Sequence, residues 1–470
     1  MANLLLLAGA GAFSLADIIH LKNGRTIWAD HVRENGNHVE YDVGDDSYAI
    51  SKSSVERIEA GGLPPAYASS SNGQGTAKDL PVFVPEDSLS GHEDLAGRVV
   101  HDGKVDPDAL TVLEKEGKPE LSATAYFLAG KHEFEHGNLS QARRYFETAL
   151  GFQPDNSTIL NYYALALVRS GNAAAALPYA ERSARAKPDS ADAYTVLGFV
   201  RFSADRTKEA AQAWKRSLEL RPDPVVEQYL AKAQRETATE ADFSQRESSH
   251  FTLRYEGKRT SEQLRHELIA TLESEYDDLV RELGVAPRAS IPVVLYTEQA
   301  FFDVTHAPSW SGAINDGRLR IPVSGLTSMT SDLARVLKHE LAHSFVNQAS
   351  GGRCPTWLNE GIAQAVEPKA LSSNGRRLAQ LFRAQQAIPY NSLEGSFMHF
   401  SPIEAVLAYD ESLAAVEYIN DTYGMSDVQR ILERLSQGSS AEAALRATIH
   451  SDYGQLESEV GRYLASKYGE

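Results

Sequence analysis

A period of 34 residues runs through the middle of the chain and constrains its fold more than any other feature. Small residues at this spacing suit points where two helices touch, large apolar residues fill the gaps, and proline closes each unit. Such a unit cannot bury its apolar face alone, so neighbouring units must stack. The period therefore predicts a helical solenoid. Its four columns are Pro154, Pro188 and Pro222; Ala142, Ala176 and Ala210; Gly130, Ala164 and Gly198; and Tyr126, Leu160 and Tyr194.

This period and pattern resemble tetratricopeptide repeats. We expect three repeats from residue 122, closed by a polar last helix at Pro224–Glu236, so that the stack occupies 122–236. A leading helical segment is expected at 92–121. The resemblance implies a protein partner on the concave face of the stack, although a purely rigid spacer is the alternative.

The size and charge of the chain exclude several function classes. Its 470 residues predict three domains at about 150 residues each. A net charge of −18 argues against nucleic-acid binding, because phosphate contacts need clustered Lys and Arg. The single cysteine, Cys354, excludes an internal disulfide framework and a zinc site built on cysteine pairs. No stretch reaches the ~18 apolar residues of a membrane span, so no transmembrane helix is expected in the mature chain.

Residues 1–16 read as a signal peptide. Leu4 to Phe13 form an apolar run, and the small residues Ser14 and Ala16 follow at the spacing of a cleavage site. The pattern predicts export, to the periplasm or the medium, with Asp17 as the first mature residue. The segment before the apolar run carries no Lys or Arg, so a short buried element or a wrongly chosen start codon is the alternative.

Residues 17–60 predict a small β module. Four strand-like runs, 18–21, 26–29, 38–43 and 48–50, are separated by Asn-Gly and Gly-Asp turn signals. Residues 61–91 are rich in Gly, Pro and Ser and are typical of a linker.

After a charged connector at 237–249, a mixed α/β pattern fills 250–470. Strands are expected at Phe251–Tyr255 and Ile291–Tyr296, and a hairpin at Ser311–Val323. The sequence beyond the hairpin is mostly helical. One helix is predicted from Asp332 to Ala349, with Ser331 as its N-cap.

This last helix contains an HExxH motif, His339-Glu340-Leu341-Ala342-His343. Histidines at i and i+4 share one helix face and can bind one Zn²⁺. Glu340 falls within the apolar arc of the helix, where a carboxylate is costly unless it faces water activated by the metal. Zinc needs a third protein ligand, and Glu360 opens a second helix that a short loop can fold back onto the first.

HELAH followed by Trp357-Leu358-Asn359-Glu360-Gly361 resembles the gluzincin class of zinc metallopeptidases. The strongest likeness is to the peptidase-MA-like domain of exported bacterial proteins, which is often fused to tetratricopeptide repeats. The resemblance implies that His339, His343 and Glu360 bind zinc with water as the fourth ligand, and that Glu340 is the general base of peptide hydrolysis. Aminopeptidases of this class carry a GAMEN element, which this chain lacks, so that specificity is disfavoured.

Three further assignments are weaker. Tyr409 is the expected hydrogen-bond donor to the transition state, with His399, Tyr390 and Tyr418 as alternatives. Gln364, one turn after Glu360, is expected to support a ligand histidine from outside the metal site. The edge hairpin at 313–322 is expected to pair with an extended peptide by strand addition.

The expected function is therefore that of an exported zinc metallohydrolase, most simply an endopeptidase, whose repeats recruit a substrate or a partner. The alternative is an interaction scaffold in which the repeats do the work and the metallopeptidase fold is vestigial or structural. Metal content distinguishes the two.

Overall fold

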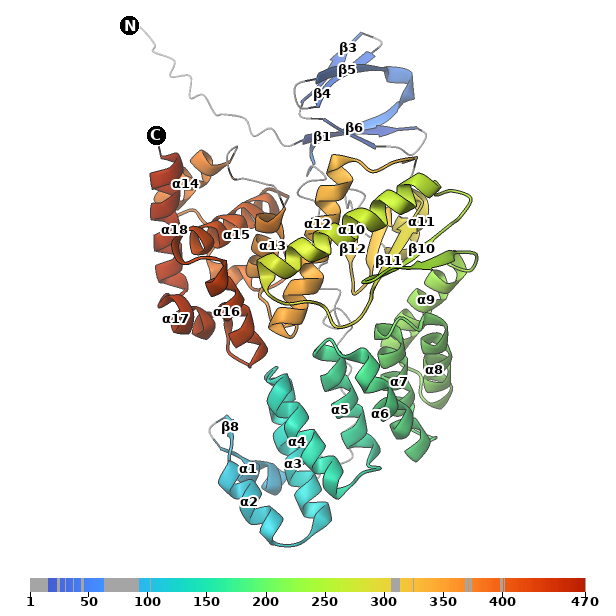
Figure 1. The fold of residues 1–470 in the computed structure, drawn as a ribbon, viewed down its shortest axis with the longest axis vertical. Coiled ribbons are helices and arrows are strands. Elements are labelled where there is room, and N and C mark those ends of the chain that lie inside the picture. Colours follow the sequence, from blue (N-terminus) through green and yellow to red (C-terminus); the bar gives the residue numbers. More distant parts are fainter. Residues whose placement is uncertain are drawn as a thin grey trace, which may run out of the picture.

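The computed structural model has three parts that follow one another along the chain (Figure 1). A set of short strands comes first, a row of helices follows, and a sheet with covering helices completes the chain. The expected fold class, a β module, an all-α repeat stack and an α+β domain, is confirmed. The structure describes residues 16–22, 26–29, 31–36, 38–43, 46–62, 93–101, 103–305, 313–323, 325–367, 371, 374–397, 400 and 402–469.

The N-terminal module pairs its strands in two antiparallel sheets, in the orders β2-β1-β6 and β3-β4-β5. Hydropathy did not predict β3 or β6, because both carry several charged residues. Most of the predicted signal peptide, 1–15, and most of the predicted linker lie outside the described residues. The strands are β1 Ala16–Leu21, β2 Thr26–Ala29, β3 His31–Asn35, β4 His38–Val43, β5 Asp46–Ser51 and β6 Val55–Gly62.

The repeat region forms consecutive helices in which small and large residues meet as the period requires. A methyl group added at Gly130 would lie 2.6 Å from the ring of Phe146, and one at Gly198 would lie 2.2 Å from Trp214 Nε1. The glycines therefore let paired helices approach around a large ring. The helices are α3 Pro119–Glu135, α4 Leu139–Phe152, α5 Ser157–Arg169, α6 Ala173–Ala186, α7 Ala191–Ser203, α8 Thr207–Leu220 and α9 Pro224–Thr239.

Two short helices precede the stack and pack on α3 through a shared apolar cluster. They are separated by a two-strand hairpin, so this leading segment is not purely helical. Its elements are α1 Glu93–Val99, β7 Val100–His101, β8 Lys104–Val105 and α2 Pro107–Lys115.

The C-terminal sheet has the strand order β12-β13-β11-β10-β9. The three inner strands, β10, β11 and β13, run parallel, whereas β9 and β12 are antiparallel edges. Strand β9 lies in the segment that was predicted to be a connector. The sequence pattern did not indicate this strand, because all side chains of β9 are exposed and no apolar alternation marks it. The strands are β9 Ser244–Glu247, β10 Phe251–Tyr255, β11 Ile291–Tyr296, β12 Ile314–Asn315 and β13 Leu319–Pro322.

Helix α12, Ser331–Ser350, connects this sheet to the helical half of the domain. It begins after an N-cap at Thr330, whose Oγ1 accepts from Leu333 N at 3.1 Å, one residue earlier than the expected cap at Ser331. It ends at Gly351, whose φ of 60° is the left-handed geometry that glycine favours. The other helices of the domain are α10 Glu262–Leu283, α11 Glu298–Thr305, α13 Thr356–Val366, α14 Gly375–Arg383, α15 Pro402–Tyr423, α16 Met425–Ser436, α17 Ala441–Ile449 and α18 Tyr453–Tyr468, and a short 3-10 helix, η3, spans Tyr390–Leu393.

In Figure 1 the repeat helices lie along one side of the C-terminal domain, with α9 nearest its sheet. Of the described helices, none combines the length and the apolar character needed to cross a membrane.

Gly361 sets how closely α13 approaches α15. A Cβ at this position would lie 2.3 Å from the Ser412 carbonyl oxygen, which is backbone and cannot swing away. We expect Gly361→Ala to lower the free energy of unfolding by about 1–3 kcal/mol, the cost of overpacking, in urea denaturation.

Gly151→Ala is the matched control: it lies in α4 with no neighbour within 4 Å. Alanine there should stabilise by about 0.5–1 kcal/mol. Equal effects of the two substitutions would contradict the packing argument.

Glu411 in α15 generates a pH-dependent prediction. The side chain is fully buried, and Ile388 N donates to its two oxygens at 3.0 and 3.1 Å. Burial raises the pKa of Glu411 from 4.5 to about 8, with Glu457 and Asp410 adding to the rise and the Ile388 bond opposing it. Because the unfolded chain ionises first, this group lowers stability progressively as pH rises from about 4.5 to 8.

Glu411→Gln should therefore flatten the fall in melting temperature between pH 5 and pH 8 and be more stable than the wild type at pH 8. The gain is on the order of 1.4 kcal/mol for each unit of the raised pKa. A glutamine at the exposed Glu433 serves as the control. A Glu411→Gln variant that follows the wild-type pH profile would refute the assignment.

Candidate metal centre

Helices α12 and α13 bring three potential metal ligands together. His339 and His343 lie on α12, and Glu360 comes from α13 after the turn between the helices. Glu360 Oε2 is 3.6 Å from His339 Nε2 and 3.8 Å from His343 Nε2, and one ligand atom of each residue lies within 4.8 Å of the others. All three side chains are buried. The structure thus assembles the three residues that were predicted to bind zinc.

The nitrogen and oxygen atoms of the three side chains are arranged to bind a metal ion rather than to hydrogen-bond to one another. His339 Nε2 and His343 Nε2 are buried without a hydrogen-bond partner among the described residues. Buried polar atoms are normally paired, so such nitrogens call for a ligand. Two ligands bound to zinc at 2.0–2.1 Å in a tetrahedron lie about 3.4 Å apart, close to the separations from Glu360. We call His339, His343 and Glu360 the cradle; their geometry suits a cation with tetrahedral coordination.

Two residues outside the cradle orient the histidines. Asn359 Oδ1 lies 3.1 Å from His343 Nδ1, and Glu367 Oε1 lies 3.6 Å from His339 Nδ1. Arg335 Nη1 in turn donates to Glu367 Oε2 at 2.9 Å. Partners of this kind fix the ring orientation of ligand histidines. Neither role was predicted, although Glu367 lies two helical turns after Glu360, a spacing that keeps both near one face.

His339 thus faces a carboxylate on each side of its ring, Glu360 at Nε2 and Glu367 at Nδ1. Gln364 is buried and donates to two main-chain carbonyls, those of Glu360 at 3.2 Å and Tyr409 at 2.9 Å. These bonds tie α13 to α15 behind the ligand. Support of a ligand histidine by Gln364 stays a prediction.

Tyr409 is 4% exposed and packs edge-on against Phe397, with ring centroids 5.4 Å apart. Its role as a donor to the transition state stays a prediction. Two alternatives have hydroxyls engaged elsewhere: Tyr390 donates to the Glu411 carbonyl and Tyr418 to Glu459. His399, the third, lies outside the described residues.

The electrostatics of the cradle favour a positive charge at its centre. Burial and the nearby His339 lower the pKa of His343 to about 3. Burial also acts to lower the pKa of His339, but the carboxylates of Glu360 and Glu367 outweigh it and raise this pKa to about 10. The two carboxylates thus favour positive charge beside His339. A dication can supply positive charge there while it binds the neutral form of the ring.

Glu340, the predicted base, is fully buried on α12 between the two histidines in sequence. Its main-chain carbonyl accepts from Asn315 Nδ2 at 2.7 Å, and the same amide reaches Ser344 Oγ at 2.7 Å. Asn315 lies in β12, so these bonds fix the edge strand to α12. Sequence reasoning missed this link because the two segments are 25 residues apart.

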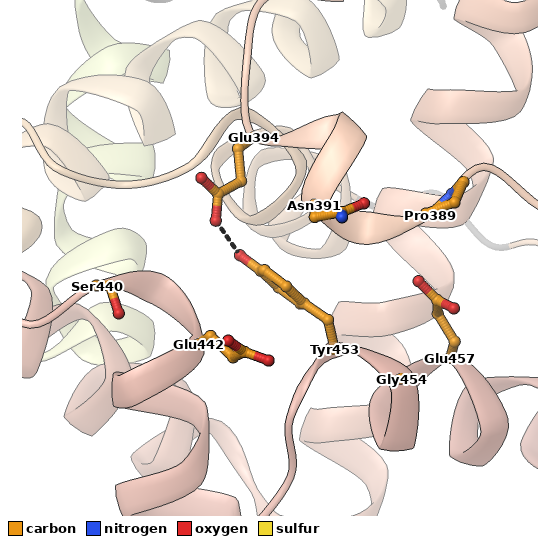
Figure 2. A pocket seen from close by; sticks show the side chains of 8 residues that line it. All are labelled: Pro389, Asn391, Glu394, Ser440, Glu442, Tyr453, Gly454 and Glu457. Atoms are coloured by element: carbon orange, nitrogen blue, oxygen red, sulfur yellow. Dashed lines mark hydrogen bonds between the residues drawn. The ribbon is translucent and has the colours of Figure 1, made fainter.

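A separate cavity of about 570 Å³ lies among η3, α17 and α18 (Figure 2). Three carboxylates line it, and one of them, Glu394, accepts from Tyr453 OH at 2.6 Å. None of the candidate metal ligands contributes to its wall. The lining residues are Pro389, Asn391, Glu394, Ser440, Glu442, Tyr453, Gly454 and Glu457.

Solved structures align with only part of this chain, at low TM-scores. The Arabidopsis OM64 TPR domain aligns with 18% identity over 25% of this chain and 99% of its own, at a TM-score of 0.25. A MamA structure from AMB-1 aligns with 22% identity over 28% of this chain and 79% of its own, also at 0.25. These scores are too low to support a further argument. The comparison with curated proteins found no match.

Protein-family models match both large parts of the chain. The tetratricopeptide repeat model matches residues 127–191 and 163–224, within helices α3 to α9. The Peptidase MA superfamily model matches residues 275–466, which include α12, α13 and the candidate metal ligands. The chain therefore carries a domain of the Peptidase MA superfamily fused to tetratricopeptide repeats.

Proposed function

We propose that this protein is an exported, zinc-dependent endopeptidase whose repeats recruit a substrate or partner protein. The family match supports a peptidase-like domain with interaction repeats. Zinc is the further step, and one observation carries it: two buried histidines with unpartnered nitrogens converge on Glu360. The proposed ligands are His339, His343 and Glu360. Export is inferred from the N-terminal sequence pattern alone.

Bound there, zinc would act as a Lewis acid on the scissile carbonyl and the attacking water. The protein supplies the proton chemistry. Glu340 takes a proton from the water molecule that attacks the carbonyl carbon and passes it to the amine that leaves. Asn359 and Glu367 hold the ligand rings in place.

The substrate backbone is proposed to pair with β12. This strand is at the edge of the sheet, hydrogen-bonded to β13 on one side, and Asn315 within it contacts α12. Strand addition to such an edge binds an extended peptide through its main chain and is tolerant of sequence. This arrangement favours an endopeptidase over an enzyme that grips a free terminus.

The first test combines metal analysis with turnover. The purified wild type should carry about one zinc per chain and cleave an unfolded protein such as casein. Glu340→Gln should retain zinc but lose activity by at least about 100-fold, because the base is removed while the ligands stay. His339→Ala should lose both zinc and activity.

Zinc content is measured by mass spectrometry and cleavage by a fluorescent casein digest. His266→Ala, a substitution on α10 outside the cradle, is the control for loss of a histidine. An active Glu340→Gln variant would refute the proposed base. Unchanged zinc in His339→Ala would refute the ligand set.

A second prediction concerns the partner of His339. Glu367→Gln removes the negative charge that faces His339 Nδ1 and that accepts a hydrogen bond from Arg335. We expect zinc affinity to fall about 10–100-fold, the usual effect of removing such a partner. Competition with a chelator measures this affinity without reference to activity. Gln364→Ala is the comparison variant, and an affinity loss there but not in Glu367→Gln would reverse the assignment.

A further inference from the structure

A cluster of buried ion pairs joins the repeat stack to the hairpin that carries β12. We call it the interdomain cluster. Its acidic and basic side chains are equal in number, so the cluster is neutral as a whole. The members are Asp205, Lys232, Glu236 and Glu240 from the repeat region and Arg254, Asp316, Arg318 and Arg320 from the C-terminal domain.

Glu236 of α9 is the centre of this cluster. Its Oε1 accepts from Arg320 Nη2 at 2.9 Å, and its Oε2 accepts from Arg318 Nη1 at 3.1 Å. Glu236 is 2% exposed, Arg318 4% and Arg320 fully buried. Removing one partner from such a set leaves an uncompensated buried charge, which the surrounding structure cannot tolerate without moving.

The turn between β12 and β13 is held by the same helix. Asp316 in this turn accepts from Arg320 Nε at 2.9 Å and from Lys232 Nζ of α9 at 3.3 Å. Nearby cations, Arg320 first among them, overcome burial and hold the pKa of Asp316 below its usual range. Arg318 also donates to the Phe202 carbonyl at 2.9 Å, at the end of α7. The repeat stack therefore hydrogen-bonds to both the turn and the strand β13 that follows it.

The opposite side of the hairpin is fixed to the metal-binding helix. Asn315 comes one residue before Asp316 and donates to the Glu340 carbonyl and to Ser344 Oγ. In the hairpin register Ile314 pairs with Arg320, so the buried arginine lies directly beside β12. The hairpin is thus hydrogen-bonded to α12 of its own domain on one side and to α9 of the repeats on the other.

We propose that Lys232 and Glu236, on the last repeat helix, are positioning residues for peptide binding at β12. They act through Asp316, Arg318 and Arg320 to fix the distance between the edge strand and the metal ligands. The repeat stack is then part of the peptidase site rather than a separate recruiting module. This inference rests on the proposed function in one respect, namely that β12 receives the substrate.

The test compares Lys232→Gln and Glu236→Gln with Lys232→Arg, which keeps the cation. Lys232 is one-third exposed, so its variants are expected to fold even where Glu236→Gln does not. Arg353→Gln is the matched control, since Arg353 contacts the repeats at Asn138 but touches no part of the hairpin. Each full-length variant is assayed for zinc content, for kinetics on a long unfolded peptide and on a blocked dipeptide, and for hydrogen exchange at 313–323.

We expect Lys232→Gln and Glu236→Gln to keep their zinc and to raise KM for the long peptide about tenfold, the effect of losing one charge-assisted hydrogen bond. Values of kcat, and of KM for the dipeptide, should change little, because the dipeptide does not span β12. Exchange at 313–323 should accelerate in the same variants. Lys232→Arg and Arg353→Gln should match the wild type in all three measurements.

The possible failures are distinguishable. An active wild type with unchanged KM and exchange in Lys232→Gln and Glu236→Gln overturns this inference alone. Faster exchange with an unchanged KM shows that α9 holds the hairpin without affecting substrate, and it also overturns the inference. A zinc-loaded wild type that cleaves neither substrate overturns the proposed function and the substrate role of both residues together.

Discussion

Helix α12 is held from two sides, and the candidate site depends on both contacts. From the sheet, Asn315 bonds the Glu340 carbonyl and Ser344, which fixes the helix against the edge strand. From the helical half, α13 places Glu360 opposite the two histidines. Ligands bound to one metal must be correct within a few tenths of an ångström. Rigid helices packed on both sides provide that precision, whereas a loop would not.

Pairing between different elements explains how the fold can bury several charged side chains. Glu367 lies between His339 and Arg335, and Glu236 lies between two arginines. Each carboxylate leaves water only where it meets donors from a different element. Such pairs contribute little net stability, but they allow only one arrangement of the elements that supply them. In this protein they determine the geometry of the site and of the domain junction.

The sequence predicted local features best. The 34-residue period predicted the repeat helices, because helix contacts such as Gly130 with Phe146 and Gly198 with Trp214 each lie within a single unit. The HExxH spacing predicted a shared face for His339 and His343, since residues four apart on a helix are neighbours. By contrast, β9 was missed because its side chains are all exposed, and the N-cap of α12 was displaced by one residue because Thr330 and Ser331 are both good caps.

The sequence by itself therefore determined the ligand types and the helix that carries two of them, because both follow from short-range spacing. Only the tertiary structure placed Glu367 beside His339 Nδ1, since that depends on how α13 lies against α12. It also decided that the last repeat helix hydrogen-bonds to the edge hairpin. These bonds join residues more than 80 apart in the chain. Contacts over such separations have no periodic signature, so they emerge only when the elements pack.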